Sequence, residues 1–389
     1  MRKLPCAGCE VLNSIYPEPD WKVIIDMQYK LYPNITAMTK PEELNRLVGQ
    51  NMNTACLAPF ETKGWSSTEA EFLGVNNCNG DQPRYIIKRL RKEKDWVMAA
   101  TNDDHWRAIT VWQQGLLDRL PDEIAHGVIA CSVDEAGYAI LMHNFSQDLL
   151  AEDQPISETD NVFILEAMAA LHAAFWHDSL LDNHELHLCK PEDFFTHTSP
   201  EKARQMAQTN PSFVLEMIIE GWRLVPKFVD AGTAGLMHDL VHDPTPLCTA
   251  LARYPQTLVH TDVRIANLGI KRDKRRRLIM LDWARQTRTV PAVDLVYYLV
   301  TGSSTGFPIS FEESINFYKQ QLAKRLGDRF YESWWQPQLE LCLLGTFSTM
   351  ACFKAWGAEH ADDEAERLSN RADLKWWAEQ AQIGASWLV

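Results

Sequence analysis

The chain has 389 residues, of which 46% are hydrophobic and 23% charged, which is ordinary for a globular protein with room for two lobes. Its formal net charge of −14 argues against general nucleic-acid binding, which needs a basic face, and is compatible with a cationic substrate. No apolar run is long enough to cross a bilayer, and the N-terminal segment lacks the apolar core of a secretory signal. We therefore expect a cytoplasmic monomer or homodimer with no membrane or nucleic-acid partner.

The nine cysteines are scattered and odd in number, so we interpret them as reduced thiols. Cys6 and Cys9 form a single C-x-x-C, and the sequence nearby shows no second pair at the spacing of a zinc site.

Residues 1–55 are predicted to form a helical preamble. Thr39 is its expected N-cap, with Pro41 in the first turn. From Leu57 to Leu90 the pattern changes to strands, with a turn at Gly64 to Thr68 and a last strand that carries Lys88.

A helix is predicted over Asp103–Leu120 from apolar residues at helical spacing: Trp106, Ile109, Trp112, Leu116 and Leu120. Two strands then follow, Gly127–Val133 and Gly137–His143, joined by a short polar turn.

Beyond Leu150 the chain is predicted to be mainly helical. His172 lies in an apolar helix and is interpreted as a packed structural histidine rather than a catalytic base. The expected helices cover residues 161–176, 202–208, 212–229 and 246–253, and much of the chain from Phe311 onward.

The most informative stretch begins with a short strand, Thr257–Val259, followed by His260, Asp262 and Asn267. Two further short strands, joined by the basic run 271–277, lead to Asp282. Phosphoryl transfer needs a carboxylate that accepts a hydroxyl proton and oxygen ligands that hold Mg²⁺ on the phosphates. This stretch offers both. The basic run itself is interpreted as a solvated hairpin.

The segments HTDVRIAN, LDW and the later Asp294-Leu295 resemble the catalytic and metal loops of the aminoglycoside phosphotransferase and choline kinase-like group. LHAAFW at residues 171–176 is similar to a segment of its ecdysteroid-kinase-like branch. The resemblance implies an α+β, two-lobed protein-kinase-like fold. A small antiparallel β-sheet N-lobe would cover residues 56–145, and a larger, mainly helical C-lobe residues 146–389.

The resemblance also implies roles for individual residues. Asp262 would accept the proton of the acceptor hydroxyl, Asn267 and Asp282 would hold Mg²⁺, and His260 and Asp294 would support the catalytic loop. ATP would contact Lys88, Gly64, Ser66, Ser67, Met142 and Asn144. The expected activity is ATP- and Mg²⁺-dependent phosphorylation of a hydroxyl on a small molecule, cationic or polyhydroxylated, such as an aminoglycoside or amino alcohol.

Two positions depart from the family pattern. Thr261 replaces the usual glycine, at a position that the chemistry does not require. Ala108 occupies the slot of the glutamate that normally pairs with the strand lysine, here Lys88. Asp103, Asp104 or a residue from elsewhere in the chain are the candidate substitutes. The Ala108 departure keeps an alternative open, a catalytically weak nucleotide-binding or scaffold protein. A protein kinase is less favoured, because the chain lacks the D-F-G and A-P-E motifs.

The acceptor pocket is expected between the middle helices and the aromatic C-terminal tail. The acidic stretch Glu359–Glu366 is a candidate attractant for an amine. Other candidate lining residues are Trp222, Arg223, Glu216, Glu220, Asp239 and Asp243. For each of these six, an ordinary core aromatic or a solvated charge is the favoured interpretation.

Overall fold

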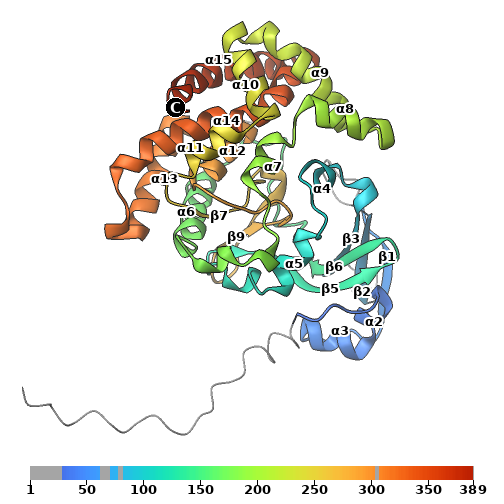
Figure 1. The fold of residues 1–389 in the computed structure, drawn as a ribbon. Helices are drawn as coiled ribbons and strands as arrows, with labels where there is room; N and C mark the ends of the chain where they lie inside the picture. Colours follow the sequence, from blue (N-terminus) through green and yellow to red (C-terminus); the bar gives the residue numbers. More distant parts are fainter. Residues whose placement is uncertain (1–28, 62–70, 78–81, 303–305, 389) are drawn as a thin grey trace, which may run out of the picture.

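The computed structural model describes residues 29–61, 71–77, 82–302 and 306–388. It has a small lobe built on an antiparallel sheet and a larger lobe made mainly of helices (Figure 1). The predicted two-lobed α+β architecture is therefore confirmed.

The sheet of the N-lobe places Lys88 on a central strand. Its strand order is β1-β2-β3-β6-β5, and every neighbouring pair is antiparallel. Lys88 lies opposite Phe72 on one side and Ile140 on the other. The predicted hairpin of β5 and β6 is confirmed. The strands are β1 (Ala55–Pro59), β2 (Glu71–Asn77), β3 (Tyr85–Arg91), β5 (Val128–Asp134) and β6 (Gly137–His143).

Two short helices, α2 (Ile35–Met38) and α3 (Pro41–Val48), pack against β5. Pro41 opens α3 as predicted, but Thr39 is not its N-cap. The Thr39 hydroxyl instead donates to the carbonyl of Ile35 at 2.8 Å, because Thr39 ends the preceding helix.

The helix predicted over 103–120 is shorter than expected. Only α5 (Arg107–Gln113) lies within the predicted range, and a separate short helix, α4 (Trp96–Ala100), precedes it. Trp106 and Gly115 both have left-handed backbones, with φ of 57° and 67°, and an α-helix cannot pass through either. The apolar residues of the predicted spacing nevertheless face the core, because Ile109, Trp112 and Leu116 are buried and Trp106 and Leu120 are partly buried.

Helix α4 belongs to the N-lobe in sequence but contacts the C-lobe. The Lys202 ammonium, from α8, donates to the carbonyl of Ala100 at 3.0 Å. Just beyond α4, the Asn102 amide donates to Asp193 of α7 at 2.6 Å. These bonds fix the segment that follows Lys88 onto the larger lobe.

The C-lobe helices agree with the predicted ranges to within a few residues, although α7 and α10 were not predicted. The long helix α14 packs along α9, α12 and α15. No helix in the described part of the chain combines the length and apolar character needed to cross a membrane. The helices are α6 (Glu158–Ala174), α7 (Pro191–Thr196), α8 (Pro200–Thr209), α9 (Phe213–Phe228), α10 (Ala231–His242), α11 (Thr245–Leu251), α12 (Ala292–Gly302), α13 (Phe311–Leu326), α14 (Glu332–His360) and α15 (Glu364–Ala385).

The segment that was predicted to be catalytic, residues 257–282, consists of short strands and loops. β7 pairs with β10, and β9 lies between β8 and β4. The predicted strands at 257–259, 268–271 and 277–281 are confirmed. Arg272 and Arg276 of the β8–β9 hairpin both contact Asp160, so part of the basic run is neutralised locally. The strands are β4 (Ile124–Ala125), β7 (Thr257–Val259), β8 (Leu268–Lys271), β9 (Arg277–Met280) and β10 (Thr287–Thr289).

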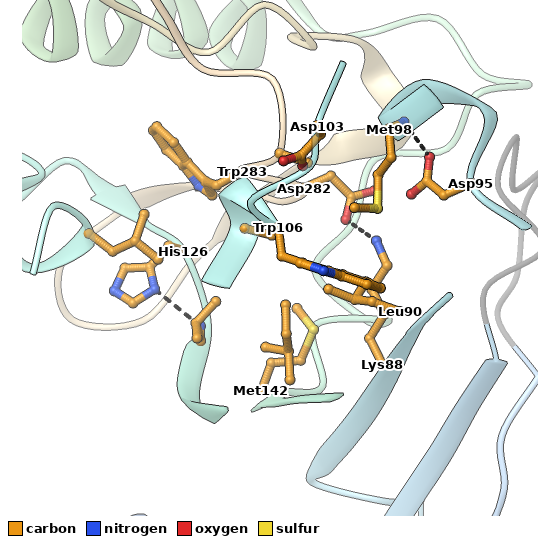
Figure 2. Close-up of a pocket in the computed structure, with 15 residues that line it drawn as sticks. Lys88, Leu90, Asp95, Met98, Asp103, Trp106, His126, Met142, Asp282 and Trp283 are labelled. Atoms are coloured by element: carbon orange, nitrogen blue, oxygen red, sulfur yellow. Dashed lines mark hydrogen bonds and ion pairs between the residues drawn. The ribbon is translucent and has the colours of Figure 1, made fainter. Parts of the chain in front are cut away.

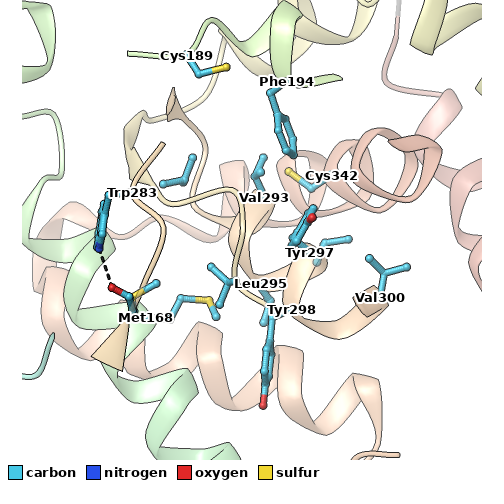
Figure 3. Packing of buried hydrophobic residues seen from close by; sticks show 14 of the residues in the cluster. Met168, Cys189, Phe194, Trp283, Val293, Leu295, Tyr297, Tyr298, Val300 and Cys342 are labelled. Atoms are coloured by element: carbon cyan, nitrogen blue, oxygen red, sulfur yellow. Dashed lines mark hydrogen bonds between the residues drawn. The ribbon is translucent and has the colours of Figure 1, made fainter. Parts of the chain in front are cut away.

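Helix α12 runs through the centre of the C-lobe core. Ten of its eleven residues are buried, and Val293, Leu295 and Tyr298 pack among side chains from several elements (Figure 3). Burying such side chains contributes about 1.5–3 kcal/mol each. The same helix carries Asp294, which has no exposed surface. A buried carboxylate needs hydrogen-bond partners, and it finds them in the catalytic loop.

Candidate active site

Asp294, from helix α12, holds the loop between β7 and β8 in place. Its carboxylate accepts the backbone N–H groups of His260 at 2.7 Å and Thr261 at 2.6 Å. His172 Nε2 lies 3.1 Å from the same carboxylate, fully buried, in the structural position predicted for it. The His260 ring in turn accepts the N–H of Asp262 at 3.2 Å. The central helix thus sets the backbone that presents Asp262.

The threonine that replaces the family's glycine has a left-handed backbone, with φ of 62°. Glycine adopts this conformation freely, whereas a β-branched residue is strained in it. The Thr261 hydroxyl compensates by donating to the carbonyl of Arg285 at 2.8 Å, and Thr261 is completely buried. The side chain therefore links the catalytic loop to the segment after β9.

We expect Thr261→Ala to lower the free energy of unfolding by about 1 kcal/mol, because the hydroxyl bond is lost and the strain stays. Thr261→Gly loses the same bond but relieves left-handed strain of about 1–2 kcal/mol. Urea denaturation should therefore find the Gly variant more stable than the Ala variant. Equal stability of the two would show that the backbone at this position is not strained.

Asp262 is surrounded by basic and hydroxyl groups. Arg285 Nη2 lies 2.6 Å from its carboxylate, Arg264 Nε lies 3.6 Å away, and the Tyr297 hydroxyl donates to it at 3.2 Å. Burial raises the pKa of Asp262, but Arg285 and Arg264 outweigh this effect and hold the pKa at about 2. The carboxylate is therefore ionised at neutral pH.

Arg285 and Tyr297 were not predicted. Tyr297 lies three residues after Asp294 in α12, so the two share a helix face, and that spacing was an available signal. Arg285 follows Asp282 in an irregular segment, where no periodicity indicates the direction of a side chain.

The two predicted metal ligands lie at one end of the β8–β9 pair. The N–H of Leu281 donates to the carbonyl of Asn267 at 2.9 Å, which places Asn267 beside Asp282. The Asn267 amide nitrogen donates to the carbonyl of Asp262 at 3.1 Å, so the amide oxygen remains for a cation. An amide and a carboxylate oxygen suit Mg²⁺. The described residues contain no cluster of three or more acidic, histidine or cysteine ligands, so phosphates and water would complete the coordination.

Lys88 forms an ion pair with Asp282 across the cleft (Figure 2). Neither substitute named from the sequence contacts it. Asp103 accepts the N–H of Arg107 at the start of α5, and Asp104 pairs with Lys92. Both carboxylates are therefore engaged locally.

A different carboxylate, Asp95, faces the small cavity that Lys88, Ala108 and Asp282 also line (Figure 2). Its side chain caps α4 by accepting the N–H groups of Val97 and Met98 at 3.0 and 3.1 Å. Burial holds the pKa of Asp95 above its usual value, although the N–H of Met98 and the Lys88 ammonium both lower it. Asp95 thus lies on the side of Lys88 where the sequence places Ala108 instead of a glutamate.

We expect Asp95→Asn to keep the helix cap, which asparagine provides equally well, and to remove the charge beside Lys88. The KM for ATP should rise about fivefold, equivalent to about 1 kcal/mol. Steady-state kinetics checks this, and Asp103→Asn serves as the neighbouring control. An unchanged KM would mean that Asp95 does not anchor the lysine.

The cleft between the lobes holds a cavity of about 540 Å³, lined by Lys88, Met142, Asn144, Asn267 and Asp282. These are all the predicted nucleotide and metal residues that the structure describes. The Asn144 side chain donates to the carbonyl of Pro83 at 2.6 Å, so it holds the hinge. Gly64, Ser66 and Ser67 lie outside the described residues.

A second cavity of about 420 Å³ opens on the other side of Asp262. Arg264 and Glu152 line both cavities, so the two meet at the catalytic loop. Helices α14 and α15 close one side, as expected of the C-terminal tail. The walls are largely apolar or aromatic and include Trp96, Val97, Val214, Met217, Val300, Met350, Phe353 and Trp356.

The six candidate lining residues from the middle helices do not line this cavity, in agreement with the favoured interpretation of a core aromatic and solvated charges. Trp222 is buried and donates to the carbonyl of Thr198, while Arg223 and Glu220 pair with each other on the outer side of α9. Helix α9 contributes Val214 and Met217 instead, because that face points toward the catalytic loop.

The two-lobed fold, with one cavity in the inter-lobe cleft and a second beside Asp262, is that of a small-molecule kinase. The family model of the ecdysteroid kinase-like family matches residues 131–329, just over half of the chain. The chain belongs to this family.

Solved structures show the same fold at low identity. A choline kinase from Cryptosporidium parvum Iowa II is 13% identical with a TM-score of 0.50, covering 94% of this chain and 97% of that chain. An ethanolamine kinase from Plasmodium vivax is 11% identical with a TM-score of 0.44, covering 96% of each chain. An aminoglycoside phosphotransferase from Streptomyces rimosus, in complex with ADP and streptomycin, is 15% identical with a TM-score of 0.45, covering 81% and 98%. No curated protein sequence matches the chain.

Proposed function

We propose that the chain transfers the terminal phosphoryl group of ATP, with Mg²⁺, to a hydroxyl of a small molecule bound beside Asp262. The observation that carries this proposal is that Asp262 lines the second cavity two residues before Arg264, which lines both cavities. Asn267, Asp282 and Lys88 lie on the nucleotide side, and the apolar cavity lies on the other.

In this mechanism Asp262 accepts a hydrogen bond from the acceptor hydroxyl and aims its oxygen at the phosphorus. A pKa of about 2 makes it a weak base. A loose phosphoryl-transfer transition state tolerates this, since positioning and charge stabilisation matter more than early proton removal. Bound Mg²⁺ would supply charge neutralisation at the phosphates. Arg264 reaches both cavities and would offset the charge on the transferred group.

The walls of the acceptor cavity favour a hydroxylated compound with an apolar body. Lys354, which also lines it, pairs with Asp373, and Arg285 pairs with Asp262. Glu152 and Glu366 are exposed carboxylates that line this cavity, and they support a cationic acceptor. Polyhydroxylated steroids of the ecdysteroid type, amino alcohols and aminoglycosides are therefore the three classes to compare.

The test is a screen of these three classes with ATP and Mg²⁺, with product detected by mass spectrometry and phosphorus NMR. We expect a phosphomonoester that requires Mg²⁺ and is absent with Asp262→Asn. ATP binding without transfer to any of the three classes would favour the alternative, a nucleotide-binding protein of low activity, which Ala108 in the glutamate slot motivates. Transfer that persists without Asp262 would contradict the assigned role.

A further inference from the structure

His197, which directly follows α7, makes a contact with the catalytic cluster that the mechanism above does not use. Its ring is 1% exposed and lines the acceptor cavity. It stacks with Trp96, with ring centroids 6.1 Å apart at 21°, and with Phe194, at 5.6 Å and 18°. One neighbour comes from the N-lobe and the other from the C-lobe, so aromatic contacts from two parts of the chain hold the ring plane.

The hydrogen bonds of His197 define its tautomer. Nδ1 lies 2.5 Å from the carbonyl oxygen of Phe194, and because a carbonyl only accepts, Nδ1 carries the proton. Nε2 lies 3.0 Å from Nη1 of Arg285, and because a guanidinium only donates, Nε2 accepts. Burial and the neighbouring Arg285 hold the pKa of His197 at about 3, so the ring is neutral at neutral pH.

The second terminal nitrogen of Arg285, Nη2, donates to the carbonyl of Thr261 at 2.9 Å and to the Tyr297 hydroxyl at 3.0 Å, and it also pairs with Asp262. Nη1 bonds to His197, and Nε has no partner among the described residues. Without His197, the other edge of a buried guanidinium would lose its hydrogen bond, and an unsatisfied buried donor is costly. His197 therefore decides whether this orientation of Arg285 is favourable.

A neutral acceptor suits this place better than a carboxylate would. A second carboxylate would compete with Asp262 for the charge of Arg285, whereas a neutral imidazole orients the guanidinium and leaves its charge to Asp262. From the contacts of His197 with Phe194, Trp96 and Arg285, we propose that His197 is a positioning residue that holds Arg285 against the catalytic Asp262. This inference rests on the proposed function of Asp262.

Substitution of His197 by asparagine or by glutamine tests its two hydrogen bonds separately. In His197→Asn the amide reaches the place of Nδ1, so the bond to Phe194 can persist while the acceptor for Arg285 is lost. In His197→Gln the amide reaches the place of Nε2 and can accept from Arg285. A packing role for the ring alone would affect both variants alike.

The first measurement needs no turnover. The carboxyl carbon of Asp262 is followed by NMR against pH in the full chain labelled at aspartate, and its signal is assigned by its loss in Asp262→Asn. The charged or titratable groups around Asp262 are Arg285, Arg264, His260 and Tyr297. Those acting on His197 are Arg285, Asp262 and Lys202. We expect the pKa of Asp262 to rise by about one unit in His197→Asn, which corresponds in free energy to the loss of one hydrogen bond. In His197→Gln the pKa of Asp262 should stay closer to the wild-type value.

The second measurement uses the acceptor from the screen above. In His197→Asn, kcat should fall about tenfold or more with little change in the KM for ATP, and the acidic limb of kcat should move to higher pH. His197→Gln should recover most of the lost kcat.

Equal losses of kcat in His197→Asn and His197→Gln would overturn the proposal. A fall in kcat in a variant whose Asp262 keeps the wild-type pKa would overturn it as well. If His197→Asn does not fold, a loss in folded His197→Gln as large as that of Asp262→Asn would overturn it too. Absence of turnover in the wild type would count against the proposed function, while the titration would still test the positioning role.

Discussion

Replacing Asp262 by asparagine should reduce phosphoryl transfer by about a thousandfold, within the range for loss of a positioned general base. Asparagine has nearly the same shape but neither accepts a proton nor attracts Arg285. Binding of ATP should survive, because Lys88, Asn267 and Asp282 lie in the other cavity. A coupled assay for ADP release measures the first effect and calorimetry the second.

Asp134→Asn is the matched control for this variant. Burial raises the pKa of Asp134, but hydrogen bonds from Arg89 and Arg91 outweigh it and hold the pKa at about 2, as the two arginines do for Asp262. It lies at the end of β5, away from both cavities. A similar loss of activity in both variants would mean that a disrupted ion pair, and not the missing carboxylate, explains the result.

Asp282→Asn should abolish the Mg²⁺-dependent part of ATP binding. Removing an outer-shell partner of a metal ligand typically weakens binding 10–100-fold, so loss of the ligand itself should cost about 100-fold or more. The change also releases Lys88 from its ion pair. Titration calorimetry with ATP, with Mg²⁺ and without it, separates the two effects, since the lysine contribution does not require the metal.

The exposed pair of Lys92 and Asp104 offers a control of the same chemistry outside the cleft. Asp104→Asn removes a lysine–aspartate contact of the same type, and we expect ATP binding to stay unchanged. Wild-type affinity in Asp282→Asn, with the same dependence on Mg²⁺, would remove Asp282 from the metal site.

The parts of this site that sequence analysis predicted are those in which chemistry and spacing lie in one short segment. Asn267 and Asp282 flank the β8–β9 hairpin, whose strands were apparent from their apolar runs, and Asp262 lies in the loop just before Asn267. The proximity of the three residues could therefore be predicted from local pairing. The positions of Lys88 and of the hinge could be predicted in the same way, from the apolar pattern of the N-lobe strands.

The parts that were missed depend on long-range packing. His197 reaches Arg285 across 88 positions of sequence, and nothing in either segment indicates the contact. The partner of Lys88 was sought in the helix after residue 103. That helix begins only at Arg107, and Asp95 faces the lysine from the preceding turn. The spacing of the apolar residues predicted the buried face of α5 correctly. It did not predict the ends of this helix, which depend on the left-handed backbone at Trp106 and Gly115.

The attachment of α4 to the C-lobe has a consequence for how nucleotide enters and leaves. The lobes are joined covalently at the hinge after β6, and α4 adds a non-covalent connection through Lys202 and Asn102. The pairing of β4 with β9 and the bonds of Arg107 and Thr110 to the carbonyls of His187 and Leu186 hold the same side of the N-lobe. Motion of the N-lobe should therefore be largest in strands β1 and β2 at the far edge of the sheet. Lys88, on the strand that leads into α4, should move least.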